Sequence, residues 1–233
     1  RALGDKIRLG LLVENLEGLA ALKAGGVKAD VWMKIDVGAH RTGLPCEKIE
    51  AARELARQAA DCPSLRLRGL LTHAGNTYGA GSAQRVQQIF TASVDKLNVM
   101  RNELHRAGFS GLEISVGDTP GCMLTSNFDG IDEIRPGNFV FFDAEQTAFG
   151  TCRPEQVAVA LACPVVACHP ERDEVVVYGG AIHLSKDCYE QNGQRIYGLA
   201  ALPQGSGWGQ PVMGGFVRSL SQEHGVIHLP GSV

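Results

Sequence analysis

Apolar residues recur along the first part of the chain in two alternating patterns. Short runs rich in β-branched residues predict strands, and longer segments with a period near 3.6 residues predict helices. Strands are expected at residues 6–13, 31–37, 67–72, 113–116 and 131–134. Helices are expected at residues 16–24, 47–60 and 83–107, the first of them capped by Asn15. Strands that alternate with helices predict βαβ units and a parallel sheet.

The pattern changes after about residue 155. Apolar runs then follow one another with turn residues between them and without a helical period, at residues 157–166, 174–180, 195–199 and 216–219. Gly and Pro cluster in residues 203–215. This pattern predicts a second, mostly antiparallel β region. We therefore expect two domains, residues 1–150 and residues 151–233.

The number of strands limits the architecture of the first domain. Five strands of the βα type are too few for a closed (β/α)₈ barrel, which has eight. They fit either an open sheet or the later strands of a barrel whose first strands lie upstream. Because the chain starts at Arg1 rather than Met, we expect a processed chain or a fragment.

Composition excludes several classes of partner. Hydrophobic residues make up 44% of the 233 residues, charged residues 20%, and the net charge is -3, so neither nucleic acid nor a membrane is expected as a partner. No apolar run reaches the roughly 18 residues that a membrane span needs, and no signal peptide opens the chain. Seven cysteines without C-x-x-C spacing predict free thiols and a cytoplasmic protein.

Polar segments that contain glycine follow four of the predicted strands. They cover residues 38–44, 73–78, 117–121 and 135–139. Each one taken alone has an ordinary structural explanation as a turn. Because ligands of α/β proteins bind at the carboxyl ends of strands, four such segments in succession predict a shared ligand.

The residue types in these segments indicate what that ligand is. Backbone N–H groups in glycine-containing turns suit a phosphate, fixed cations hold an oxyanion or a ring nitrogen, and His and Tyr side chains move protons. The candidates are Gly117, Asp118, Thr119, Gly137 and Asn138 for the phosphate, Arg41 and Arg135 as cations, and His73 and Tyr78 for proton transfer. Neither G-x-x-x-x-G-K nor G-x-G-x-x-G occurs at these turns, which argues against a nucleoside triphosphate or a dinucleotide.

The order of these segments is similar to that of one enzyme family. Residues 34–43, 73–78, 115–120 and 133–143 resemble the Lys-x-Asp-x-Gly-x-x-Arg-x-Gly, His-x-Gly-x-x-Tyr, Ser-Val-Gly-x-Thr-Pro and Glu-x-Arg-Pro-Gly stretches of alanine racemase-like enzymes, the type III pyridoxal phosphate (PLP) fold. Residues 178–187 and 221–225 resemble the β domain of its D-serine dehydratase and D-threonine aldolase branch. The chain is therefore identified as a D-serine dehydratase-like, D-threonine aldolase-like member.

The resemblance implies a fold, a cofactor and an activity. The fold class is α/β, a partial (β/α)₈ TIM-type barrel followed by a mostly antiparallel β domain. The implied enzyme is a PLP-dependent lyase acting on a β-hydroxy-D-amino acid, most simply a D-serine dehydratase that yields pyruvate and ammonia. Residues 117–119 and 137–138 would hold the phosphate, and Arg41 would lie near the ring phenolate. Arg135 would face the ring nitrogen, and the catalytic His73 and Tyr78 would line the substrate side.

The resemblance also implies features beyond these residues. The lysine that forms the Schiff base with PLP is expected before Arg1, with Lys34 a less favoured surrogate. A divalent metal (Zn, or Mn or Mg) is expected in the full-length member, but neither His224 nor His228 is expected to bind it. A homodimer is also implied. The alternatives are a D-threonine or 3-hydroxy-D-aspartate aldolase, a non-catalytic PLP-binding protein, and an isolated chain that is inactive.

Overall fold

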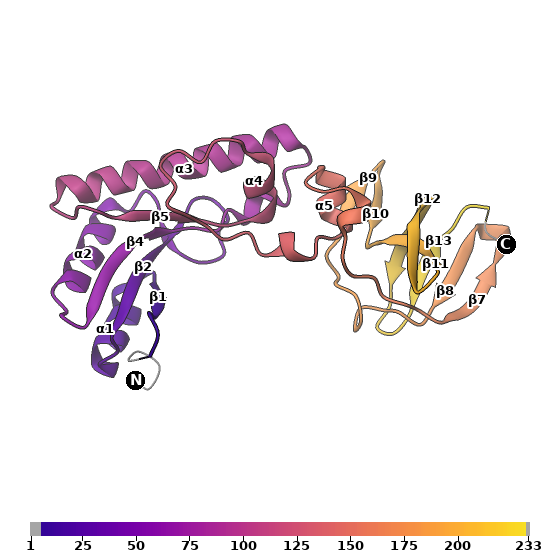
Figure 1. The fold of residues 1–233 in the computed structure, drawn as a ribbon, viewed down its shortest axis with the longest axis horizontal. Helices are drawn as coiled ribbons and strands as arrows, with labels where there is room; N and C mark the ends of the chain where they lie inside the picture. The colour runs from indigo at the N-terminus through magenta and orange to yellow at the C-terminus, as the bar shows by residue number, and fades with distance from the viewer. Residues whose placement is uncertain (1–5, 232–233) are drawn as a thin grey trace. The chain divides into compact units, whose positions relative to one another are not determined.

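The first part of the chain forms a parallel sheet with helices between its strands. In the computed structural model, which describes residues 6–231, the strand order is β1-β2-β4-β5-β6, with β3 beside β2. Figure 1 labels β1, β2, β4 and β5 of this sheet. The strands are β1 (Gly10–Val13), β2 (Ala29–Asp36), β3 (Leu44–Pro45), β4 (Leu65–Leu71), β5 (Glu113–Val116) and β6 (Glu133–Ile134). The connecting helices are α1 (Leu16–Gly25), α2 (Ile49–Ala60), α3 (Ala83–Arg106) and the short α4 (Thr119–Leu124). The predicted alternation of strands and helices is confirmed.

Local signals explain where the helices begin and end. The side chain of Asn15 accepts a hydrogen bond from the Gly18 N–H at 2.8 Å, and left-handed Gly26 ends α1. Ser82 caps α3 in the same way, through the Arg85 N–H at 3.2 Å. The apolar stripe predicted for α2 is its buried face, made of Ala52, Leu55, Ala56 and Ala59.

The core lies between this sheet and its helices. The central strand β2 contributes Val31, Met33 and Ile35, and the long helix α3 contributes Leu97 and Met100, all fully buried. Burying side chains of this size stabilises the fold by about 1.5–3 kcal/mol each. Because the sheet is parallel and packed, its strands end at one common edge, where their loops are held in fixed positions.

The second part of the chain is antiparallel. Its main sheet has the order β11-β12-β13-β8-β7, and β9 pairs with β10 in a separate hairpin. The strands are β7 (Val165–His169), β8 (Glu174–Val177), β9 (Tyr189–Gln191), β10 (Gln194–Ile196), β11 (Leu199–Gln204), β12 (Gly207–Leu220) and β13 (Gly225–His228). A short helix, α5 (Ala144–Phe149), precedes them.

One local prediction for this part is wrong. The run at residues 157–166 is not one strand, because no ladder forms before β7 begins at Val165. The Gly- and Pro-rich residues 203–215 belong to the predicted β region, and β12 continues from Gly207 through Pro211 to Leu220. Only the tight turn at Gly205, with φ +58°, separates β12 from β11. Strands β9 and β13 were not predicted.

The chain divides into two compact units, one ending at Gly137 and the other starting at Asn138. The domain division expected at residue 150 stays a prediction. Within residues 6–231, no helix combines the length and the apolar character that crossing a membrane requires.

Candidate functional site

The loop that follows β2 is folded tightly around one carboxylate. Asp36 accepts hydrogen bonds from the backbone N–H groups of Gly38 and His40 at 2.9 and 3.1 Å, and its other oxygen lies 3.0 Å from the His40 ring Nδ1. Burial works against ionisation of Asp36, yet these hydrogen bonds hold its pKa below the usual value. Gly43 closes the loop at φ +121°, where an added Cβ would lie 2.6 Å from the Asp36 nitrogen. The loop therefore presents Arg41 from a rigid backbone.

The loop that follows β4 carries the two residues proposed for proton transfer. The rings of His73 and Tyr78 stack with their centroids 6.3 Å apart. Between them, Gly75–Thr77 form a turn of 3₁₀ helix, in which Thr77 is fully buried. The Tyr78 hydroxyl accepts a hydrogen bond of 3.4 Å from the Thr119 N–H, so this loop contacts the one that follows β5.

Asp118 joins the loops that follow β4 and β5. It is 1% exposed, and its Oδ2 accepts hydrogen bonds from the Gly121 N–H at 2.6 Å and from the Thr77 hydroxyl at 2.9 Å. Burial raises the pKa of Asp118 to about 6. The carboxylate therefore caps helix α4 and fixes the neighbouring turn. Because the side chain of Asp118 is engaged within the protein, only its backbone N–H is a candidate for binding the phosphate.

Arg135 follows β6 and is held on several sides. Its Nε donates to the Ser115 hydroxyl at 2.7 Å, and its Nη2 donates to the Thr72 carbonyl at 2.7 Å. The Ser115 hydroxyl in turn donates to Glu133. Gly117 allows this close packing, because a Cβ there would lie 2.8 Å from the Arg135 carbonyl oxygen. None of residues 6–231 accepts a hydrogen bond from Nη1, which remains available to a ligand.

Electrostatics place four of these side chains in one neighbourhood. Lys34 on β2 is 9% exposed, and burial together with the charges of Arg135 and Arg41 lowers its pKa to about 8. Burial and the charges of Arg41, Lys34 and Arg135 also lower the pKa of His73, which is therefore neutral at pH 7. Three cations next to a neutral imidazole are the surroundings in which an anionic ligand is stabilised.

Two of the predicted residues lie at the boundary between the two units. Gly137 ends the first unit, and no atom lies within 4 Å of where its Cβ would be. Asn138 begins the second unit, and its side-chain amide donates to Asp143 at 2.6 Å. Their role in phosphate binding stays a prediction.

Some residues of the site were not singled out from the sequence. Thr77, Ser115 and Glu133 all lie in the segments that carry the family resemblance, so the signal was present. Their roles depend on contacts across strands, which sequence spacing does not give.

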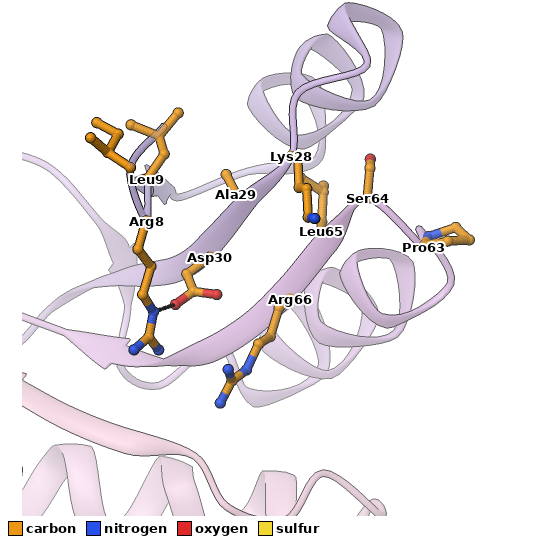
Figure 2. A pocket seen from close by; sticks show the side chains of 10 residues that line it. Arg8, Leu9, Lys28, Ala29, Asp30, Pro63, Ser64, Leu65 and Arg66 are labelled. Carbon is orange, nitrogen blue, oxygen red and sulfur yellow. Dashed lines mark hydrogen bonds and ion pairs between the residues drawn. The ribbon is translucent and has the colours of Figure 1, made fainter. Parts of the chain in front are cut away.

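A hollow lies at the opposite, amino-terminal edge of the sheet. It has a volume of about 340 Å³ and is lined by the ends of β1, β2 and β4 (Figure 2). Its main polar contact is the ion pair between Arg8 and Asp30, at 2.7 Å. Because the carboxyl edge holds the unpartnered donor and the lowered pKa values, we assign the functional site there. Among the described residues, no three His, Cys, Asp or Glu side chains are grouped to hold a metal ion.

The fold and the site define an α/β protein with a cluster of positively charged side chains at the carboxyl ends of a parallel sheet. Residues 3–145 match the family model described as alanine racemase, N-terminal domain, and residues 158–233 match the putative serine dehydratase domain. The chain therefore belongs to the D-serine dehydratase-like branch of the alanine racemase fold, a family of PLP-dependent enzymes. The resemblance inferred from the motifs is confirmed, as is the fold class.

Individual relatives agree with this assignment. The chain is 30% identical over 230 residues to a D-threo-3-hydroxyaspartate dehydratase of Delftia sp., covering 94% of this chain and 58% of the relative. It is 26% identical to the D-serine dehydratase of Dictyostelium discoideum, covering 77% and 49%. A solved structure of a metal-free mutant form of D-threo-3-hydroxyaspartate dehydratase superposes with a TM-score of 0.80, at 27% identity and covering 95% and 59%. The chain thus spans about half the length of the curated relatives it matches.

Proposed function

We propose that the protein is a PLP-dependent lyase that dehydrates a β-hydroxy-D-amino acid, with D-serine as the simplest substrate and pyruvate and ammonia as products. The observation that carries this proposal is the cluster of Lys34, Arg41, Arg135 and His73 at the carboxyl edge of the sheet. The names of the two curated relatives support the reaction class.

The residues at this edge fit PLP by charge and by donor type. The cofactor carries a phosphate, a phenolate and a ring nitrogen, and the site offers three cations and a free Arg135 Nη1. We assign the phosphate to the backbone of residues 117–119, with Gly137 and Asn138 as further candidates. Arg41 would hold the phenolate oxygen, and Nη1 of Arg135 would donate to the ring nitrogen.

The protein's own side chains would handle the proton and the orientation of the substrate. When bound, PLP supplies an electron sink for the negative charge that develops at the substrate Cα. His73, neutral at pH 7 because its pKa is lowered, can accept a proton at a ring nitrogen. Tyr78 stacks against His73 and limits the orientations of the imidazole.

The reaction is tested by product analysis with the full-length protein and PLP. We expect D-serine to give pyruvate, and D-threo-3-hydroxyaspartate, the substrate in the name of the 30% identical relative, to give oxaloacetate. Incubation with D-threonine checks for an aldolase, which would release glycine. Glycine as the sole product from these substrates would contradict the dehydratase and favour the aldolase.

We also propose that the protein is a cytoplasmic homodimer and that a divalent metal assists it. The solved relative described as a metal-free form supports the metal, because that description implies a form that holds one. Light scattering should give twice the mass of the chain, and elemental analysis of the purified protein should give one divalent metal per subunit. A monomeric mass would contradict the homodimer, and activity without metal would contradict the role of the metal.

A further inference from the structure

We infer that Glu133 and Ser115 are positioning residues that fix the guanidinium of Arg135 in a single orientation, with its Nη1 directed at the ring nitrogen of the cofactor. This inference rests on the proposed function, because it assumes that PLP occupies the site. It adds two residues that neither bind the cofactor nor touch the substrate.

A continuous set of contacts connects the three side chains. Ser115 is fully buried on β5, and its hydroxyl donates its only proton to the Glu133 carboxylate. The oxygen lone pairs then face Arg135, whose Nε donates to them at 2.7 Å. The same Nε lies 3.3 Å from Glu133. Glu133 thus sets the direction of the hydroxyl, and the hydroxyl sets the direction of the guanidinium.

Two backbone carbonyls hold the other side of the guanidinium. Nη2 of Arg135 donates to the Thr72 carbonyl at 2.7 Å and lies 3.3 Å from the Ser115 carbonyl. Thr72 is itself fixed, because its hydroxyl donates to the Ile35 carbonyl at 2.8 Å and its N–H donates to the Ser115 carbonyl at 3.0 Å. Because Nε and Nη2 both donate hydrogen bonds, the planar guanidinium of Arg135 has a single orientation. In this orientation, Nη1 has no acceptor among residues 6–231.

Charge gives Glu133 a second effect on the same group. Burial lowers the pKa of Arg135, and the neighbouring Glu133 carboxylate raises it. The charges of Arg135 and Arg41 both act on Lys34, so the site is rich in positive charge. Without Glu133, the guanidinium keeps the repulsion of the other cations and loses a compensating anion. We expect it to move toward solvent, since its side chain is already 33% exposed.

The test uses full-length protein prepared without PLP, in wild-type form and as Glu133→Ala, Ser115→Ala and Glu133→Gln. Glu113→Ala is the matched control. Glu113 is the first residue of β5, the strand that carries Ser115, and forms an ion pair with Arg68. The first measurement is the dissociation constant of PLP. The second is the ¹⁵N shift of ring-labelled PLP between pH 6 and 9, which reports whether the ring nitrogen is protonated.

We expect Glu133→Ala and Ser115→Ala to bind PLP about tenfold more weakly, the effect of losing one charge-assisted hydrogen bond. Their ring nitrogen should take up a proton within the pH range, whereas in the wild type a fixed cation opposes protonation. Glu133→Gln, whose amide oxygen still accepts from the Ser115 hydroxyl but which carries no charge, should lose less affinity than Glu133→Ala. The double variant Glu133→Ala/Ser115→Ala should lose less affinity than the sum of the two single losses, because both residues act in part through the contact between Ser115 and Arg135.

The possible failures are distinguishable. If the wild type binds no PLP, the proposed function is wrong. If the wild type binds PLP and both alanine variants match it in affinity and ¹⁵N shift, the inference is overturned and the proposed function stands. An equal loss of affinity in Glu113→Ala would attribute the effect to general destabilisation and would also overturn the inference.

Discussion

Replacing Asp118 by Asn tests the most strongly perturbed carboxyl group of the site. The pKa of Asp118 is raised from 3.8 to about 6 by burial. At 1.36 kcal/mol per pKa unit, this difference corresponds to about 3 kcal/mol. The pKa of Asp118 is higher in the folded than in the unfolded state, so its contribution to the unfolding free energy is fully present below pH 3.8. The contribution is lost as the pH rises through 6. A side-chain amide does not titrate, so the Asp118→Asn variant escapes this loss.

The effect of Asp118→Asn therefore depends on pH in a defined direction. The amide oxygen can still accept from the Gly121 N–H and the Thr77 hydroxyl, but the amide nitrogen takes the place of Oδ1, a buried atom without a partner. That replacement costs about 1–3 kcal/mol at every pH. Between pH 4 and pH 8, the unfolding free energy of the variant minus that of the wild type should rise by about 2 kcal/mol.

Urea unfolding at each pH measures this difference. Trp32 lies on β2 in the same unit as Asp118 and is 9% exposed, so its fluorescence reports on the unfolding of that unit. The only other tryptophan, Trp208, belongs to the second unit and is replaced by Phe in both proteins. A difference that stays constant within about 0.5 kcal/mol from pH 4 to 8 would refute the argument that burial controls this carboxyl group.

Further predictions concern single groups of the site. Gly43→Ala should lower the unfolding free energy by about 3 kcal/mol or more in urea unfolding, because its Cβ would lie 2.6 Å from a backbone nitrogen at positive φ. Gly137→Ala, whose Cβ meets no atom within 4 Å, should change it by less than about 0.5 kcal/mol, and equal effects would contradict the strain. Competitive acetylation should show Lys34 losing its proton near pH 8, and Arg135→Gln should move that midpoint upward; an unchanged midpoint would exclude the proposed charge effect. The acidic limb of kcat/KM should lie below pH 6.5 if His73 is the base, and a limb above this pH would argue against it.

Local sequence signals were sufficient for helices α1, α2 and α3 of the first unit, whereas the short α4 was not predicted. Asn15 and Gly26 enclose α1 through contacts with residues three or four positions away. The stripe of apolar residues on α2 specifies its buried face whatever it packs against. These features depend on near neighbours in the chain, so the sequence carries them completely.

The strands of the second unit depended on partners that are distant in sequence. Residues 157–164 have the β-branched and apolar composition of a strand but form no ladder. Only single backbone hydrogen bonds join Ala158 to Phe141 and Pro164 to Tyr178. Residues 207–215 are rich in Gly and Pro, which are uncommon in strands, yet pairing with β11 draws them into β12. Composition measures how well a residue fits a strand, whereas the ladder itself requires a second backbone.

The candidate site also has one part that the sequence predicted and another part that only the structure shows. Arg41, His73, Tyr78 and Arg135 were found in the sequence, because each follows a strand in a recognisable segment. The cap made by Asp118 and the contacts of Ser115 with Glu133 and Arg135 join different loops, and only the structure shows them.

The sequence by itself determined the alternation of elements and the family, and it supplied the candidate side chains of the site, since all three depend on residue type and short spacing. The tertiary structure decided which groups are buried and which charges lie together. Lys34 is an ordinary lysine in the sequence, and its pKa falls to about 8 only because folding removes it from water and places Arg135 and Arg41 nearby. Desolvation and charge proximity are properties of the packed fold, so they cannot be read from residue order alone.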